Sequence, residues 1–283
     1  MNPSKSFRFT KSKRARPIFI LLSVYLGALS LLVLFETYLL FPAPPVDYGM
    51  WNAQSFGASE HFIESEGNTK VHAWTFFAKG DVKTTLIFCH GNGESLGLLG
   101  DEMATIRDEW KVNVVAFDFR GYGKTGGTPN EPNILADAIA VGRWVRNNEA
   151  FREHKIIAMG RSLGGAPAIE IAIDQKTDGL ILDRTFSSIV DVAASRYFFF
   201  PVRLLMRNQF KSIDKIGKYS GSLLQMHGDV DEVVPYKFGK RLFDASVSSG
   251  KKFLPVRGLR HNSSWPEEFW IEGKRMVEML GEK

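Results

Sequence analysis

Short apolar runs alternate with longer amphipathic stretches through most of the chain. Several runs are apolar at nearly every position, which is typical of strands that are buried on both faces. The predicted strands are Val71–Phe77, Thr84–Cys89, Val112–Asp118, Lys155–Gly160, Gly179–Asp183, Ser222–His227 and Lys252–Val256. The stretches between the strands have helical periodicity. The clearest predicted helices are Glu131–Asn147, Leu163–Asp174, Tyr236–Ser246 and Pro266–Leu280.

This alternation predicts an α/β protein with a mostly parallel central sheet and helices on both faces. Such sheets place their functional sites at the carboxyl ends of the strands. We expect one domain over residues 42–283, interrupted at residues 185–221, where no strand is predicted. That insertion is interpreted as a short helical cap over the site, although ordinary packing of a long connection is an equal alternative.

The amino-terminal segment has a different pattern. Residues Ile18 to Phe35 carry no charge, and 18 residues of helix rise about 27 Å, close to the hydrocarbon thickness of a bilayer. A secretory signal peptide is the alternative, but no good small-x-small cleavage site follows the run. We therefore predict a basic cytoplasmic tail over residues 1–16 and an uncleaved transmembrane anchor over residues 17–41, with the rest of the chain on the opposite side.

The net charge of +5 comes from the tail. Six basic residues and no acidic ones lie in the first sixteen positions: Lys5, Arg8, Lys11, Lys13, Arg14 and Arg16. The remaining chain is close to neutral, so the composition does not favour a nucleic-acid partner. The single cysteine, Cys89, cannot form an internal disulfide and leaves the redox compartment open.

The pattern G-x-S-x-G, typical of a nucleophile elbow, occurs twice, around Ser162 and around Ser95. An elbow needs a strand, a sharp turn and then a helix, with glycines beside the serine to avoid clashes. Ser162 has this context because the predicted strand Lys155–Gly160 precedes it and an apolar helix follows it. Ser95 follows its strand only after a glycine-rich loop. We therefore predict Ser162 as the nucleophile.

A serine hydroxyl needs a base, usually a histidine that a carboxylate orients. In folds with this elbow the order along the chain is serine, acid, histidine. His261 follows Ser162 and the last predicted strand, and is the predicted base. The acid should follow the strand Ser222–His227, where spacing leaves three candidates open: Asp229, Asp231 and Glu232.

The oxyanion of the reaction needs two backbone N–H donors. One donor should be the residue after the nucleophile, Leu163. The glycine-rich loop after Thr84–Cys89 should supply the other, for which we choose Asn92. The sequence has no H-E-x-x-H motif and no paired cysteines, so we expect neither a metal nor an organic cofactor.

Five segments together resemble one family in residue type and order: residues 90–93 (HGNG), 118–123 (DFRGYG), 160–164 (GRSLG), 227–235 (HGDVDEVVP) and the pair His261-Asn262. The chain resembles the membrane-anchored α/β-hydrolase-domain proteins of the serine α/β-hydrolase superfamily, which are related to prolyl-oligopeptidase-type catalytic domains. The resemblance implies an α/β-hydrolase fold over about Glu36 to Leu280. It implies Asp231 as the triad acid, and Asp118 and Arg120 as groups that stabilise a neighbouring loop. Leu259 and Arg260 depart from the family, which often has glycines there, as does Ser263, where an acidic residue is common.

The sequence thus predicts a membrane-anchored, lipase-like serine hydrolase that cleaves an acyl ester or thioester through an acyl-enzyme. The expected partners are a small acyl substrate, including lipids, and a membrane bound through residues 17–41. The alternatives are a serine peptidase of the prolyl-oligopeptidase type and a non-catalytic binding protein on the same scaffold. A glycan on the sequon Asn262–Ser264 would obstruct His261, which favours a bacterial periplasm over a eukaryotic lumen for the catalytic domain.

Overall fold

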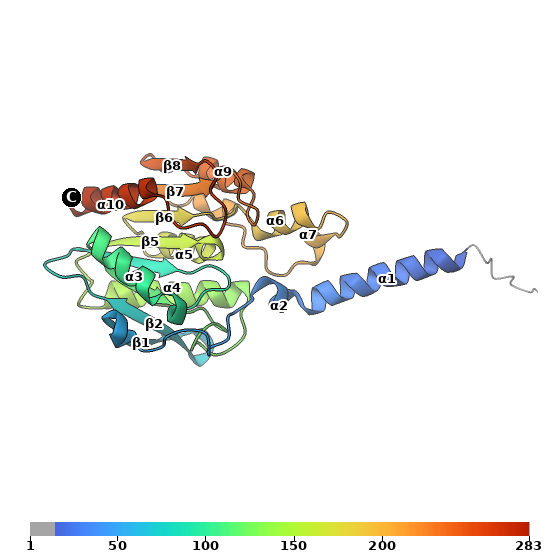
Figure 1. Ribbon diagram of the computed structural model, residues 1–283, viewed down its shortest axis with the longest axis horizontal. Helices are drawn as coiled ribbons and strands as arrows, with labels where there is room; N and C mark the ends of the chain where they lie inside the picture. The colour runs from blue at the N-terminus through green and yellow to red at the C-terminus, as the bar shows by residue number, and fades with distance from the viewer. Residues whose placement is uncertain (1–14, 283) are drawn as a thin grey trace, which may run out of the picture.

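The protein is built on one eight-stranded sheet (Figure 1). The computed structural model describes residues 15–282, so the predicted basic tail lies almost wholly outside it. All neighbouring strands are parallel except where β2 pairs with β1 and β4. In spatial order the strands are β1 (Ala58–Ser65), β2 (Thr69–Phe76), β4 (Asn113–Phe117), β3 (Thr84–Cys89), β5 (Lys155–Arg161), β6 (Gly179–Asp183), β7 (Ser222–Gly228) and β8 (Lys251–Val256).

The predicted α/β fold with a mostly parallel sheet is confirmed, and all seven predicted strands form within two residues of their predicted ends. The sequence pattern missed β1, which lies at the edge of the sheet and pairs only with β2. Only Ala58 and Ile63 of its eight residues are buried. An edge strand this polar lacks the apolar signal on which the prediction depended.

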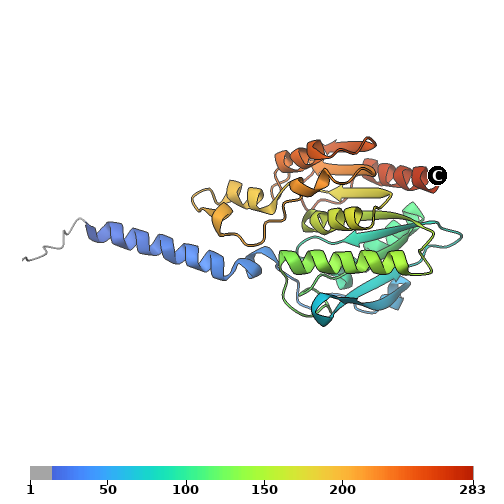
Figure 2. The same ribbon diagram turned by 180° about the vertical axis from the view of Figure 1, so that it is seen from behind.

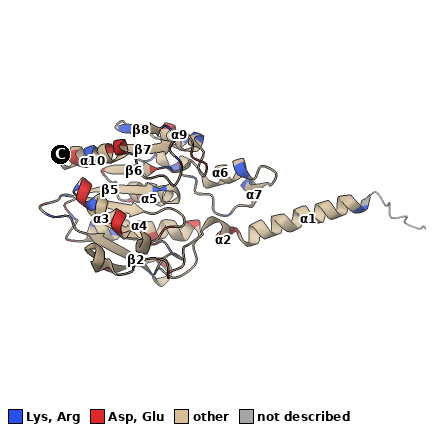
Figure 3. Ribbon diagram, in the orientation of Figure 1, with Lys and Arg blue, Asp and Glu red and all other residues tan. Residues whose placement is uncertain are grey.

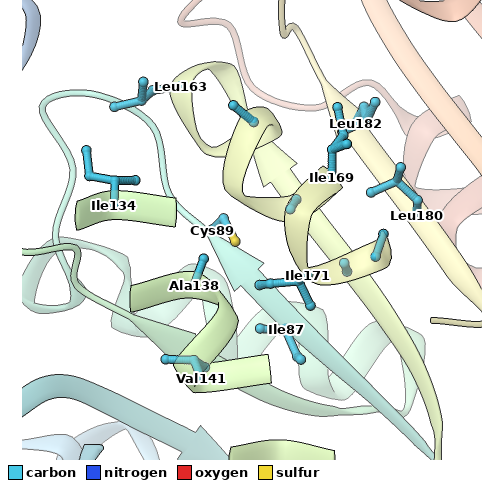
Figure 4. Packing of buried hydrophobic residues seen from close by; sticks show 14 of the residues in the cluster. Ile87, Cys89, Ile134, Ala138, Val141, Leu163, Ile169, Ile171, Leu180 and Leu182 are labelled. Atoms are coloured by element: carbon cyan, nitrogen blue, oxygen red, sulfur yellow. The ribbon is translucent and has the colours of Figure 1, made fainter. Parts of the chain in front are cut away.

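Helices cover both faces of the sheet, as the two opposite views show (Figures 1 and 2). One face carries α3 (Leu96–Trp110) and α10 (Glu267–Gly281), and the other carries α4 (Glu131–Asn147), α5 (Gly165–Asp174) and α9 (Tyr236–Ala245). Side chains alternate between the faces along each strand. On β3, Leu86 and Phe88 belong to the first apolar layer, whereas Ile87 and Cys89 face α4 and α5 (Figure 4).

Apart from the amino-terminal helix, the remaining helices are short and lie mostly near the carboxyl edge of the sheet. Between β6 and β7 the chain forms α6 (Ile189–Arg196), α7 (Val202–Leu205) and α8 (Ile213–Ile216). We call residues 185–221 the cap segment. Single 3₁₀ turns occur at Ala53–Phe56, Glu66–Asn68 and Ser162–Gly164.

The amino-terminal helix α1 (Ala15–Leu34) projects away from the body of the protein (Figures 1 and 2). It is almost free of charge (Figure 3), and over Arg16–Leu34 it is the one described helix long and apolar enough to cross a bilayer. The helix ends at Leu34, before the predicted anchor boundary at residue 41. A separate helix, α2 (Glu36–Leu40), follows and packs on the domain, and Phe41 is buried in its core.

Candidate active site

Ser162 stands on a sharp turn between β5 and α5. Its φ of 51° lies in the left-handed region, which costs a non-glycine residue conformational energy and lifts its side chain above the sheet. A Cβ on Gly160 would collide with the backbone of Gly164, and a Cβ on Gly164 would collide with the carbonyls of Cys89 and His90. Both glycines are therefore required by the close backbone packing that makes the turn.

Three predicted residues meet at this turn. His261 lies in the loop between β8 and α10, with Nε2 3.0 Å from the Ser162 Oγ and Nδ1 2.8 Å from the Asp231 Oδ2. Both distances are within hydrogen-bond range. The imidazole therefore bridges the hydroxyl and the carboxylate. This arrangement suits proton transfer from serine to histidine, with the carboxylate orienting the ring.

Asp231 is buried and held by its own turn. Its Oδ1 accepts hydrogen bonds from the N–H groups of Val233 (2.9 Å) and Val234 (2.7 Å), which leaves Oδ2 for His261. The Nε2 of His227 lies 3.5 Å from Oδ2 and donates to the Val234 carbonyl at 2.8 Å. Burial lowers the pKa of His227 below its ordinary value, so the neutral ring packs beside the carboxylate without adding a charge.

The other two candidate acids lie differently. The Oδ1 of Asp229 accepts from the Gly258 N–H at 2.7 Å. The Oε2 of Glu232 lies 3.4 Å from the backbone nitrogen of His261 and pairs with Arg260. Only Asp231 of the three contacts the imidazole among the described residues.

Asn92 lies beside Ser162, but its side chain is engaged elsewhere. Its Nδ2 donates to the Leu40 carbonyl at 2.6 Å, and its Oδ1 accepts from the Tyr122 hydroxyl at 2.7 Å. Burial raises the pKa of Tyr122, which keeps the phenol protonated as a donor. Asn92 and Leu163 both line the cavity at Ser162, and their backbone N–H groups remain the predicted oxyanion donors.

Ser95, the rival serine, is buried at the start of α3, and its Oγ has no hydrogen-bond partner among the described residues. It is not part of the Ser162 cluster. Asp118 accepts the Leu96 N–H at 2.9 Å, and Arg120 forms an ion pair with Asp137. The contacts of both groups hold the loops around the site together.

A cavity of about 200 Å³ adjoins Ser162. Asn92, Ser162 and Leu163 form its floor, and most of its other lining side chains are apolar: Leu39, Leu40, Phe186, Ile189, Val192, Ala193, Tyr197, Val233 and Val234, with Arg196 as the charged exception. The sequence prediction missed Leu39 and Leu40, which it assigned to the membrane. The charge of Glu36 inside an apolar run was the sequence signal that the residues after it could leave the membrane and pack on the domain.

A second cavity, of about 380 Å³, is lined by His261 and by mostly polar side chains. Arg161, the residue before the nucleophile, is largely buried in its wall and pairs with Glu94, Glu102 and Asp183. Burial opposes its charge, but these three carboxylates raise its pKa above the ordinary value. The guanidinium also lies 5.0 Å from the ring centroid of Trp265. One cavity thus offers apolar surroundings beside Ser162, and the other offers polar surroundings beside His261.

Within residues 15–282, no group of three or more His, Cys, Asp and Glu side chains is arranged to hold a metal ion.

Comparisons with known proteins agree with this fold. Residues 80–212 match the family described as serine aminopeptidase, S33. The chain is 28% identical to an uncharacterised protein of Mycobacterium tuberculosis over 219 residues, which cover 77% of this chain and 76% of that one. It is 31% identical to human α/β hydrolase domain-containing protein 17B over 184 residues, covering 64% of this chain and 62% of that one.

Solved structures show the same architecture. The Pyrococcus furiosus esterase Pf2001 superimposes with a TM-score of 0.68 at 19% identity, covering 84% of this chain and 99% of the esterase. Est1E of Butyrivibrio proteoclasticus, solved with ferulic acid bound, gives a TM-score of 0.65 at 19% identity, covering 78% of this chain and 99% of Est1E. The sheet order, the elbow and these matches define an α/β hydrolase. The chain belongs to the serine α/β-hydrolase superfamily, and the matches support hydrolase activity.

Proposed function

We propose that the protein is a serine hydrolase that cleaves an acyl ester or thioester through an acyl-enzyme. Ser162 attacks the carbonyl carbon while His261 Nε2 takes the hydroxyl proton, and Asp231 orients and stabilises the imidazolium that forms. The N–H groups of Asn92 and Leu163 bind the oxyanion. His261 then donates its proton to the leaving group, and a water molecule hydrolyses the acyl-enzyme with His261 again as the base.

The observation that carries this proposal is the pair of contacts made by His261, 3.0 Å to Ser162 and 2.8 Å to Asp231. A nucleophile, a base and an orienting acid within hydrogen-bond distance of one another are what acyl transfer needs. A binding protein on the same scaffold would need no such alignment.

The cavity beside Ser162 supports an acyl substrate. Its apolar walls suit a hydrocarbon chain, because burying such a chain is favourable by roughly 0.8 kcal/mol per CH₂ group. A polar leaving group would suit the second cavity, which His261, Arg161 and Glu102 line. We propose that residues 16–34 anchor the enzyme in a membrane with the catalytic domain in a bacterial periplasm.

A serine peptidase is the second candidate function. Its support is the match of residues 80–212 to the serine aminopeptidase family. The two candidates differ in the bond cleaved and share the same serine, so a panel of acyl esters, thioesters and aminoacyl amides separates them.

The first test is labelling of the detergent-solubilised full chain with a fluorophosphonate, which reacts with activated serines. We expect labelling of the parent protein and of Ser95→Ala, and none of Ser162→Ala. Folding of each variant is checked by circular dichroism. A folded parent protein that neither labels nor turns over any substrate of the panel would contradict the enzyme proposal and favour a binding protein.

A further inference from the structure

The cap segment carries an apolar tip that the proposed chemistry does not use. Over residues 197–206, which we call the cap tip, Phe198 is 70% exposed, Phe199 74% and Leu204 85%. Soluble proteins seldom display several large apolar side chains together unless the patch contacts a partner or a membrane. The exposed apolar patch is therefore expected to contact a partner or a membrane.

The cap tip lies against α1, and both views place the two side by side (Figures 1 and 2). The Tyr25 hydroxyl donates to the Phe199 carbonyl at 3.0 Å, and the Tyr25 and Phe200 rings stack with centroids 5.5 Å apart. Val202 and Leu205 line a small cavity together with side chains of α1: Leu29, Leu32 and Val33. The apolar surface of the tip is thus continuous with that of the helix.

The position of Tyr25 sets the depth of the tip. At about 1.5 Å per residue, Tyr25 lies about 14 Å before Leu34 along the helix axis. Half of the hydrocarbon core of a bilayer is about 15 Å thick. If α1 spans the bilayer, a segment bonded to Tyr25 lies inside the leaflet nearest the catalytic domain.

We propose that the cap tip enters that leaflet beside α1, and that the cavity at Ser162 takes its acyl chain directly from the bilayer. The covering partner is lipid, and the substrate is an acyl chain of a membrane-resident ester or thioester. This inference rests on the proposed hydrolase activity and on the proposed anchor.

Several backbone groups of the tip are already paired within the protein, as a lipid environment requires of polar groups. The N–H groups of Tyr197, Phe200, Val202, Leu204 and Met206 all donate to backbone carbonyls, at distances between 2.8 and 3.0 Å. Pro201, also in the tip, has no N–H group. The Phe199 carbonyl is satisfied by α1 itself.

Charged groups mark the border of the tip. Arg196 precedes it and donates to the Glu232 carbonyl at 2.6 Å, and Arg207 follows it and pairs with Glu36 at 3.0 Å. If the tip enters the leaflet, both guanidinium groups lie at the level of the lipid headgroups. Arg203 lies within the tip, but its guanidinium reaches back to Asp191 in α6, as long basic side chains do at a membrane surface.

The cavity at Ser162 is built between the anchor and the cap. Leu39 and Leu40 of α2 line it together with Val192 and Tyr197 of the cap segment. Tyr197 is also the first residue of the cap tip. An acyl chain that leaves the bilayer between α1 and the tip therefore meets the apolar wall of the cavity before it meets water.

The insertion is tested on the full chain in phosphatidylcholine/phosphatidylglycerol vesicles. Phe199→Cys is labelled with the environment-sensitive fluorophore NBD, and the one native cysteine, Cys89, is buried and does not compete. Val247→Cys is the control, an exposed apolar site just before β8 at the opposite edge of the sheet. We expect acyl-chain nitroxide lipids to quench position 199 and aqueous iodide to quench position 247. Iodide quenching of both positions alike would overturn the insertion.

A second experiment tests acyl entry by comparing the activity of the enzyme on two substrates. The double variant Phe198→Ser/Phe199→Ser should lose about tenfold or more in kcat/KM for a long-chain ester embedded in vesicles, because its tip no longer favours lipid. Its turnover of water-soluble p-nitrophenyl acetate and its fluorophosphonate labelling should remain those of the parent. Equal activity of parent and variant on the embedded ester would overturn acyl entry from the bilayer.

Failures of the underlying proposals have different signatures. An inactive, unlabelled parent protein would contradict the proposed hydrolase activity and therefore also the entry of an acyl substrate from the bilayer. The NBD quenching experiment would still decide whether the cap tip enters the bilayer. Extraction of the parent protein from vesicles by alkaline carbonate would contradict the anchor and the insertion together.

Discussion

The three acids after β7 differ in what they contact, although they lie within four residues of one another. The turn that starts at Gly228 directs the Asp231 carboxylate inward, where two backbone N–H groups fix Oδ1 and His261 takes Oδ2. Asp229 is fastened to Gly258 instead. A carboxylate held by three partners keeps one orientation, which is what the imidazole needs.

We expect Asp231→Asn to lower kcat by about 10³–10⁴-fold with little change in KM, because an amide stabilises the wrong tautomer of His261 and no imidazolium. Steady-state kinetics on a water-soluble ester measures the effect. Asp229→Asn is the matched control and should retain the kcat of the parent. An equal loss in both variants would mean that general damage to the turn, not a role of Asp231, lowers the rate.

For individual residues, local context and chain order predicted Ser162 and His261, and the structure brings the two side chains together. It could not choose among Asp229, Asp231 and Glu232 by spacing, since one residue of difference changes the side on which a side chain leaves a turn. The resemblance to a known family made that choice. Leu39 and Leu40 could not be predicted as cavity walls, because their neighbours in the cavity are more than fifty residues away in the sequence.

Among the elements, the junction of α1, α2 and the cap segment is held by one carboxylate. Glu36 is 5% exposed, and its Oε1 accepts from the N–H groups of Arg207 and Asn208 and from the Asn208 side chain, while Oε2 meets the Arg207 guanidinium. Hydrogen bonds to a buried charge are stronger than neutral ones. The hydrogen bonds of Glu36 to Arg207 and Asn208 therefore fix the end of the cap tip against the start of α2.

We expect Glu36→Gln to destabilise this junction by about 1–3 kcal/mol, because the amide retains the shape but loses the charge and one acceptor. Hydrogen exchange followed by mass spectrometry should show faster exchange in residues 197–208 and little change in β5. Glu278→Gln, on the exposed face of α10, is the control and should leave exchange unaltered. Unchanged exchange in the Glu36 variant would contradict a tethering role.

Periodicity predicted the buried strands and the long helices because each of them has a continuous apolar signal. It assigned residues 17–41 to one segment, whereas the structure divides them between α1 and α2, because hydropathy does not register that Glu36 pairs with a partner 171 residues away. It missed β1 because that strand is only partly buried.

On the scale of the whole molecule, α1, the cap segment and the cavity at Ser162 bring apolar side chains together near the carboxyl edge of the sheet. The helix α1 and the cap segment lie at that edge (Figure 1), and residues of α2 and of the cap segment line the cavity. The opposite edge, where parallel strands begin, carries no part of the site. If α1 spans a bilayer, this arrangement turns the Ser162 cluster toward the membrane and the rest of the domain toward water.

We expect the domain to lie on the side opposite the basic tail, because basic residues next to a span stay cytoplasmic. In bacterial cells, alkaline phosphatase fused at the carboxyl terminus should be active, and green fluorescent protein fused there should be dark. Exchanging the six basic residues of the tail for acidic ones should reduce the phosphatase signal. A fluorescent fusion of the unaltered chain would place the domain in the cytoplasm.

The Glu36 junction also has a consequence for the order of events during synthesis. The helix α1 is synthesised before the sheet, but Asn208 follows only after six of the eight strands have been made, and His261 comes later still. The cavity at Ser162 therefore has no complete walls, and the serine has no base, while the chain is still being delivered. A nascent chain therefore lacks the contact between Ser162 and His261 until the residues after β8 have been made.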